Sequence, residues 1–282
     1  MDNRVKTVFL LGALTGLLLF VGRLVGGFQG LTFAFILAIF MNVGSYFFSH
    51  KLVLFMYGAK PADKNTYSQL YSMVSDIAHK AKVPVPNVYI MSSPTPNAFA
   101  TGPTPSKAVI AFTTGILGLL NYDELRGVAA HEMAHIQHRD MLITTIAATI
   151  ASVIGYVSFA VRWGAMFGGY GRDDRNGQNL FGLIALAILV PIMATLLQLA
   201  ISRSREFLAD EKAARLLKDK NGLANALHKL EVGVHHEPMR GGSEATSSLF
   251  IVNPFRASTF LSLLSTHPRT EDRIKRLREL RF

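Results

Sequence analysis

One pentapeptide in the sequence has residue types and spacing that can bind a metal ion and activate water. His131, Glu132 and His135 form the pattern H-E-x-x-H. On a helix, side chains four residues apart lie on the same face, so both imidazoles can reach one ion. Glu132 follows the first histidine and can reach a water molecule beside that ion, where a carboxylate acts as general base. The chemistry that this pattern predicts is zinc-dependent hydrolysis.

A third metal ligand must come from another part of the chain. The metzincin continuation of the motif needs glycine at position 138 and histidine at position 141, but the chain has His138 and Met141 there. His138 lies within one helical turn of the motif, although its place near the predicted helix end would strain the position of an ion. A distant carboxylate is the other solution, because it completes a His₂Glu site with one coordination position open for water.

Four long segments without Asp, Glu, Lys or Arg predict a membrane protein. The chain of 282 residues is 50% hydrophobic and only 17% charged, whereas soluble domains average about 25% charged residues. The uncharged segments are Thr7–Gly22, Leu24–His50, Met141–Val161 and Asn176–Ser202. Three of them reach the roughly 20 residues that a helix needs to cross a hydrocarbon core, and the first is slightly shorter. We therefore expect four membrane helices, at about 7–23, 31–49, 141–161 and 180–201.

These segments divide the chain into two hydrophobic hairpins and a protease domain in two parts. Residues 1–50 are expected to form an uncleaved hairpin, because no A-x-A cleavage site follows the first apolar segment and a second one begins almost at once. Residues 141–202 are expected to form the second hairpin. Residues 51–140, with the H-E-x-x-H helix, and residues 203–282 then form the two parts of the protease domain.

The basic residues indicate the orientation in the membrane and argue against nucleic acid as a partner. The formal net charge is +10, but the 29 Lys and Arg residues are spread over the polar segments without a binding motif. Arg4, Lys6 and Lys51 flank the first hairpin, which places both of its ends in the cytoplasm by the positive-inside rule. The absence of cysteine excludes disulfides, a cysteine zinc site and thiol catalysis.

Topology and spacing select Glu206 as the third ligand. A ligand must return to the side of the membrane on which the motif lies, and Glu206 does so five residues after the fourth segment ends at Ile201. At 1.5 Å per residue, His135 and Glu206 each lie about 8–9 Å from the end of a membrane segment. Asp140 is too close to the motif along the helix to be a ligand. Asp210, one turn after Glu206, can hold a ligand imidazole through its second nitrogen.

The polar segments predict a mainly α fold with a small β-sheet. Apolar periodicity indicates a helix that begins near Tyr67 and ends near Ala81, and a capping-box pattern from Asn121 to Glu124 begins the helix that carries the motif. Short strands are expected at Asn87–Met91, Asn97–Thr101 and Lys107–Thr113. Later helices are expected at Ala209–Lys218, Leu223–Val232 and Glu271–Arg281, with a loop at His235–Asn253.

The chain resembles the HtpX-type membrane zinc endopeptidases, which are relatives of the prenyl-protein endopeptidases. The segments that carry the resemblance are His131–His135, Ser202–Asp210, Pro96–Ala100 and Ser265–Pro268 with Arg273. The match covers essentially the whole chain. It implies a gluzincin-type zinc protease domain at the cytoplasmic face of a bacterial inner membrane. It also implies one Zn²⁺ per chain on His131, His135 and Glu206, with Glu132 catalytic.

The resemblance also implies roles for two further segments. Asn97, Ala98, Phe99 and Ala100 are expected to form an edge strand that binds an extended substrate by strand addition, with an ordinary hairpin strand as the alternative. His267 is expected to donate to the oxyanion of the tetrahedral intermediate, with packing against Pro268 as the alternative. Four further histidines are expected at the surface or at an interface, without a role: His138, His228, His235 and His236.

The sequence leaves three alternative functions. The favoured one is an endopeptidase that hydrolyses misfolded or damaged membrane proteins in quality control and stress response, with protein substrates and the lipid bilayer as partners. An intramembrane zinc protease is the nearest alternative, but polar residues flank the H-E-x-x-H motif on both sides. A membrane scaffold with a structural metal is the other alternative, and it would need four protein ligands where three strong ones are found. The oligomeric state is not predicted.

Overall fold

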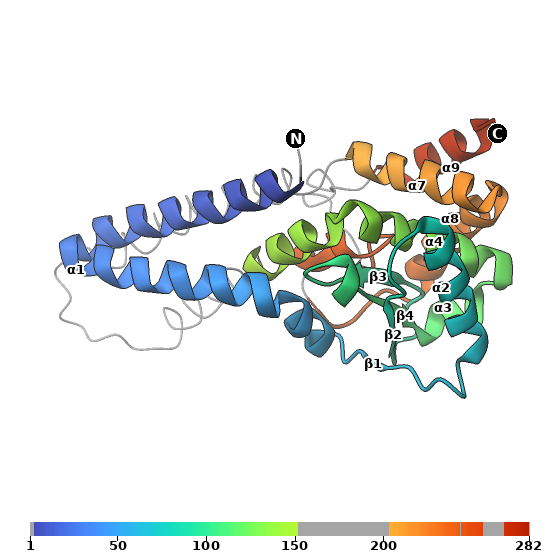
Figure 1. The fold of residues 1–282 in the computed structure, drawn as a ribbon, viewed down its shortest axis with the longest axis horizontal. Helices are drawn as coiled ribbons and strands as arrows, with labels where there is room; N and C mark the ends of the chain where they lie inside the picture. Colours follow the sequence, from blue (N-terminus) through green and yellow to red (C-terminus); the bar gives the residue numbers. More distant parts are fainter. Residues whose placement is uncertain (1–2, 152–202, 243, 256–267, 282) are drawn as a thin grey trace.

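The protein is mainly helical, with one small mixed sheet beside a long apolar hairpin (Figure 1). The computed structural model describes residues 3–151, 203–242, 244–255 and 268–281. The helices are α1 (Asn3–Met56), α2 (Ser68–Ala81), α3 (Thr114–Leu119), α4 (Tyr122–His138), α7 (Arg203–Leu217), α8 (Asn221–His236) and α9 (Thr270–Glu279). The strands are β1 (Lys60–Pro61), β2 (Asn87–Met91), β3 (Ala98–Thr101) and β4 (Val109–Thr113). Short 3₁₀ helices lie at η1 (Pro105–Lys107) and η2 (Glu244–Leu249). The predicted fold class is thus confirmed in its coarse form.

Helix α1 folds back on itself at Gly27, where the backbone φ is +57°. A straight helix would place Thr15 and Asn42 about 40 Å apart. Instead Asn42 Nδ2 donates to Thr15 Oγ1 at 2.8 Å, so the two arms lie side by side. At the tip, a Cβ on Gly22 would lie 2.5 Å from the carbonyl oxygen of Gly30, which shows how closely the arms approach. Residues 3–56 therefore form the expected helical hairpin.

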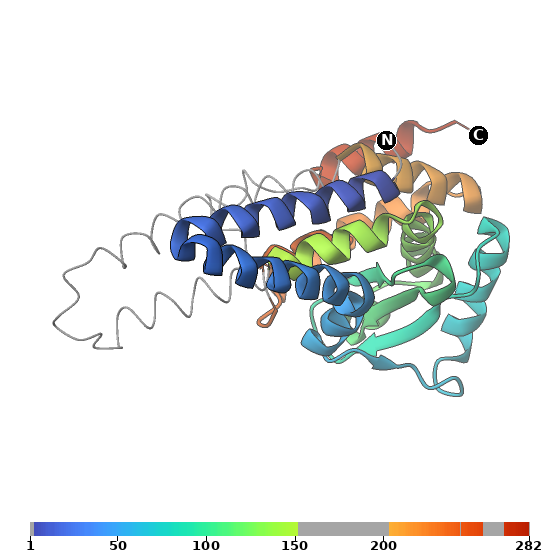
Figure 2. The ribbon, with the colours of Figure 1, turned by 60° about the vertical axis from the view of Figure 1, so that its left-hand side comes forward.

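The expectation of four membrane helices is not confirmed within the described part of the chain. One helix there is long and apolar enough to cross a membrane, Gly27–Met56. Two further apolar helices are shorter, Thr7–Phe20 and Asp140–Ala151. The expected helix at 180–201 and residues 152–161 of the one at 141–161 lie outside the described residues. Figure 2 shows the helix Asp140–Ala151 running between the two arms of α1, where Ile143, Ile146 and Ile150 pack against Leu14.

The sheet joins this hairpin to the helical domain through its two faces. Its strand order is β1-β2-β4-β3, with β2 and β4 parallel and the other pairs antiparallel. Alternate side chains of β4 point to opposite faces, as strand geometry requires. Ile110 and Phe112 join the core beneath the helices, whereas Val109 and Ala111 pack with Val53 and other residues near the end of α1. These four residues of β4 are therefore buried on both faces of the sheet.

Helix α4 lies at the centre of the domain, in contact with α2, α7, α8 and β3. Its start is fixed as predicted, because the Asn121 side chain accepts from the backbone N–H of Glu124 while the Glu124 carboxylate accepts from the N–H of Asn121. Both bonds satisfy donors that a helix start leaves free. Its end is set by Arg139, whose left-handed backbone (φ 58°) stops the helix after His138. The loop expected at His235–Asn253 is only partly confirmed, because α8 continues to His236 and η2 follows.

The close crossing of α4 and α8 requires glycine at position 127. A Cβ on Gly127 would lie 2.7 Å from the backbone N of Leu223 and 2.8 Å from its Cα, and backbone atoms cannot rotate away. We expect Gly127→Ala to lower the free energy of unfolding by about 1–3 kcal/mol, because overpacking forces the two helices apart. Thermal unfolding of the purified protein measures this change.

Gly118→Ala is the matched control for this prediction. A Cβ there meets nothing within 4 Å, and alanine has the higher helix propensity, so stability should stay the same or rise by up to about 1 kcal/mol. Equal losses in the two variants would show that the helix crossing does not require a glycine.

Candidate metal centre

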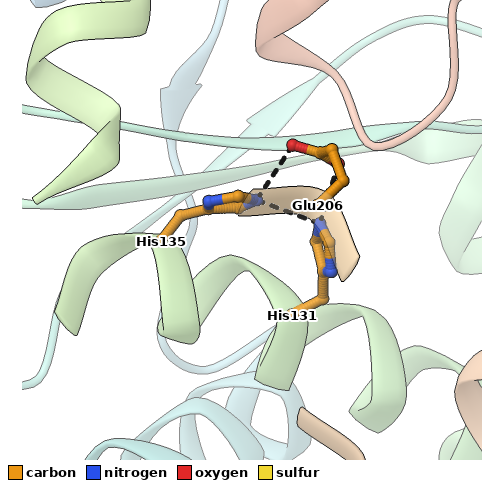
Figure 3. Close-up of side chains that lie close together, drawn as sticks. All are labelled: His131, His135 and Glu206. Carbon is orange, nitrogen blue, oxygen red and sulfur yellow. Dashed lines mark hydrogen bonds and ion pairs between the residues drawn. The ribbon is translucent and has the colours of Figure 1, made fainter. Parts of the chain in front are cut away.

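Three side chains from two helices converge on one point. His131 and His135 lie on one face of α4, and Glu206 comes from the first turn of α7, which packs beside it (Figure 3). The two Nε2 atoms are 3.1 Å apart, and the Glu206 carboxylate oxygens lie 3.7 Å from the His131 Nε2 and 3.5 Å from the His135 Nε2. Within the described residues, this is the one cluster of its kind.

The spacing of these atoms matches what a four-coordinate zinc ion needs. Two ligand atoms bound tetrahedrally at about 2.05 Å lie about 3.3 Å apart, close to the separations observed. The residues surround a cavity of about 20 Å³, which is lined by Glu132, Ala100 and the three converging residues. A volume of this size accommodates one water molecule or ion. The residues present therefore fit a small divalent cation.

The outer nitrogen of His131 is held by a buried carboxylate. Asp210 lies one helical turn after Glu206, and its Oδ1 is 2.9 Å from the His131 Nδ1. A carboxylate only accepts hydrogen bonds, so it places the proton of the ring on Nδ1 and leaves the Nε2 lone pair facing Glu206. Burial lowers the pKa of His131, which favours the neutral ring that binds metal.

Arg273 on α9 holds this carboxylate in turn. Its side chain is 2% exposed, and it donates from Nε and Nη2 to the two oxygens of Asp210 at 2.8 and 2.7 Å. Burial raises the pKa of Asp210, but the charge and hydrogen bonds of Arg273, together with the contact with His131, lower it by more, and the pKa falls below its ordinary value. Arg273 Nη1 also donates to the carbonyl oxygen of Ile251 at 2.8 Å. The sequence motifs included Arg273 without assigning it this role.

His135 has a comparable partner that sequence reasoning missed. The left-handed Arg139 turns the chain back after α4, so Asp140 Oδ2 lies 3.3 Å from the His135 Nδ1. Burial lowers the pKa of His135, but the hydrogen bond with Asp140 and the charge of Glu206 raise it to about 9. Asp140 is not expected from the sequence to reach the site, but its carboxylate contacts the Nδ1 side of the His135 ring, opposite the Nε2 that faces Glu206.

Glu132 lines the same cavity and is 2% exposed. Burial raises the pKa of its carboxyl group to about 7, although the charge of His135 and a backbone hydrogen bond from Ala100 oppose the rise. A general base is most effective when its pKa lies near the working pH. The position and the pKa of Glu132 therefore suit proton transfer.

Strand β3 lies at one edge of the sheet, and part of this edge is occupied by the chain itself. The backbone N–H of Ile251 donates to the carbonyl oxygen of Ala98 at 3.2 Å. The side chain of Asn97 donates to the carbonyl oxygen of Val252 at 2.7 Å. Phe99 points to the opposite face of the sheet from α4, where it packs with Val53 and Phe250. Of the four residues expected to bind substrate, Ala100 alone lines the metal cavity.

Two other expectations concern histidines outside the cluster. His138 lies apart from the converging residues, with Nδ1 2.9 Å from the carbonyl oxygen of Ala134 and Nε2 beside the Lys212 ammonium group. It is therefore not a third ligand. His267, the expected oxyanion donor, lies outside the described residues, so its role stays a prediction.

The fold and the cluster define a metallopeptidase of the H-E-x-x-H class, with a third ligand from a later helix. A profile for "Peptidase family M48" matches residues 64–281. The chain belongs to this family. A "Protease HtpX homolog" of Syntrophobacter fumaroxidans is 48% identical over 99% of this chain and 100% of its own length. Another, of Pyrococcus furiosus, is 49% identical over 98% of this chain and 95% of its own length. The resemblance seen in the motifs is thus confirmed.

A solved structure shows the same fold. The crystal structure of S. mikatae Ste24p is similar with a TM-score of 0.54 over 97% of this chain, at 16% sequence identity. The chain spans 65% of the length of that structure. At this identity the likeness concerns the fold alone.

The Arg273–Asp210 pair predicts a large stability effect. We expect Arg273→Met to lower the free energy of unfolding by about 3–5 kcal/mol, because it leaves the buried Asp210 charge without its partner. Chemical denaturation of the purified protein measures the loss. Arg278→Met on the exposed side of the same helix is the control and should change stability by less than about 0.5 kcal/mol. A loss at Arg273 no larger than at Arg278 would contradict the role of the pair.

Proposed function

We propose that the protein is a zinc-dependent endopeptidase that hydrolyses membrane proteins at the cytoplasmic membrane face. The observation that carries this proposal is the convergence of His131, His135 and Glu206 beside the buried Glu132. Three protein ligands leave the fourth position of a tetrahedral ion for water or substrate, as in catalytic zinc sites. A closed structural site would need a fourth ligand, and the described residues supply three at this point.

The proposed mechanism assigns one step to each side chain. A zinc ion held by the three ligands would supply Lewis acidity and lower the pKa of water at the open position. Glu132 takes the proton of that water as it attacks the scissile carbonyl, and then passes the proton to the leaving amine. Asp210 keeps the His131 ring in the tautomer that faces the ion.

The proposed substrate is an extended peptide segment that adds to the outer edge of β3. Binding of this kind uses backbone hydrogen bonds and therefore accepts many sequences. Because Ile251 now bonds to Ala98, the segment Phe250–Val252 must move before a substrate strand can take this position. A broad peptide preference of this kind suits the degradation of misfolded membrane proteins, which we propose as the biological role.

The proposed membrane position follows from the layout of the chain. The apolar hairpin α1 and the helix Asp140–Ala151 lead away from the polar domain that contains the metal centre (Figure 2). Polar residues flank the H-E-x-x-H motif on both sides, at Asn121–Gly127 and Gln137–Asp140, so the zinc site is expected outside the hydrocarbon. This favours an enzyme at the membrane surface over a protease that cleaves inside the bilayer.

Glu132→Gln separates the enzyme from a structural metal protein. We expect this variant to bind zinc in a 1:1 ratio but to cleave an unfolded protein such as β-casein about 10²–10⁴-fold more slowly, because it lacks the general base. Metal analysis and a cleavage assay, before and after chelation and zinc addition, measure both properties. In the wild type, chelation should abolish cleavage and zinc should restore it.

Glu124→Gln is the matched control, with the same change in the same helix. Glu124 is buried and pairs with Lys229, but it lies outside the metal cavity. This variant should retain cleavage within a few fold of the wild type. Wild-type rates in Glu132→Gln, or zinc loss from it, would rule out the proposed role of Glu132.

The membrane orientation can be tested with single cysteines, since the chain has none. Phe28 lies at the tip of the α1 hairpin and Asn65 lies in the polar domain, and both are exposed. We expect Phe28→Cys to react with a membrane-impermeant maleimide added to intact cells, and Asn65→Cys to react in inside-out vesicles. Labelling of Asn65→Cys in intact cells would contradict the cytoplasmic location.

A further inference from the structure

We propose that Asp140 and Arg205 form a positioning pair that sets two metal ligands, His135 and Glu206, at the same time. This inference rests on the proposed zinc site and adds residues to it that do not touch the ion. Asp140 uses both carboxylate oxygens, because Oδ2 lies 3.3 Å from the His135 Nδ1 and Oδ1 accepts from Arg205 Nη1 at 3.1 Å.

The pair lies inside the protein, where its geometry is constrained. The side chains of Asp140 and Arg205 are 7% and 12% exposed. Exposed ion pairs contribute little because water screens them and their side chains are mobile, but a buried pair is far less screened. Loss of one partner of a buried ion pair removes its compensating charge. Arg205 therefore helps to hold the Asp140 carboxylate in place.

The pair also connects the two halves of the site along the chain. Asp140 is the second residue after the end of α4, and Arg205 is the neighbour of Glu206 in the first turn of α7. The 64 residues between them, 141–204, include the two later hydrophobic segments. The ion pair thus fixes the start of α7 against the end of α4, and this sets the distance from Glu206 to His135.

A second series of side-chain contacts of the same kind, around the other histidine of the site, supports this role. His131 faces Asp210, and Asp210 accepts from Arg273. Each imidazole therefore contacts a carboxylate, and that carboxylate in turn contacts a guanidinium group. Carboxylates that orient ligand imidazoles in this way contribute about 10–100-fold to metal affinity. Asp140 and Arg205 provide for the second histidine what Asp210 and Arg273 provide for the first.

Zinc affinity, measured by competition with a chelator, tests the inference without using activity. The variants are Asp140→Ala, Asp140→Asn, Arg205→Gln and the double variant Asp140→Ala with Arg205→Gln. We expect Asp140→Ala to weaken zinc binding about 10–100-fold. Asp140→Asn keeps an acceptor for the ring but loses the ion pair, so it and Arg205→Gln should each weaken binding by a smaller factor. The double variant should bind zinc no more weakly than Asp140→Ala, because both changes break the same series of contacts.

One control variant makes the result decisive. Glu124→Gln breaks a buried ion pair away from the metal cavity, so it should lower the unfolding temperature of the metal-free protein and leave zinc affinity unchanged. Zinc affinity within threefold of the wild type in Asp140→Ala, or additive effects in the double variant, would overturn the positioning role. A wild-type protein that binds no zinc would instead overturn the proposed function itself.

Discussion

The interaction on which the structure depends is the contact between each ligand imidazole and a buried carboxylate. Asp210 and Asp140 hold the Nδ1 sides of His131 and His135, and so both Nε2 atoms point toward Glu206. A ring without such a partner could rotate or take the other tautomer, and the 3.1 Å separation of the two Nε2 atoms would be lost. The candidate metal centre is therefore an assembly of three converging side chains and the groups behind them, and its geometry is set by the protein's own side chains.

The rest of the fold serves to bring α4 and α7 together at this point. Small residues such as Gly127 on α4 let neighbouring helices approach closely, and the sheet lies against α4 through the inner face of β3 and β4. The other face of the sheet packs on the end of α1. The catalytic helix is thus connected to the end of the apolar hairpin through one layer of strands.

Much of the fold and of the site could be predicted because the sequence signals are local patterns or follow from the positions of the hydrophobic segments along the chain. The capping box at Asn121 and Glu124 determines where α4 begins, and the expected return of the chain to the side of the membrane on which the motif lies predicts Glu206. Asp140 escaped this reasoning because its contact depends on a left-handed backbone at Arg139, a conformation that no local pattern requires of arginine. The pairing of Ile251 with Ala98 joins positions about 150 residues apart in the sequence, and such contacts have no signature in a single chain.

The order of the ligands along the chain has a consequence for biosynthesis. Glu206 follows His135 by 71 residues, and Arg273, which holds Asp210, comes later still. At about 5–20 residues per second, a ribosome needs on the order of 4–14 s to pass from one ligand to the next. During that interval the emerging polypeptide has the two imidazoles but not Glu206, the third converging side chain. The cluster, with the guanidinium group behind Asp210, is complete only after α9 has been made.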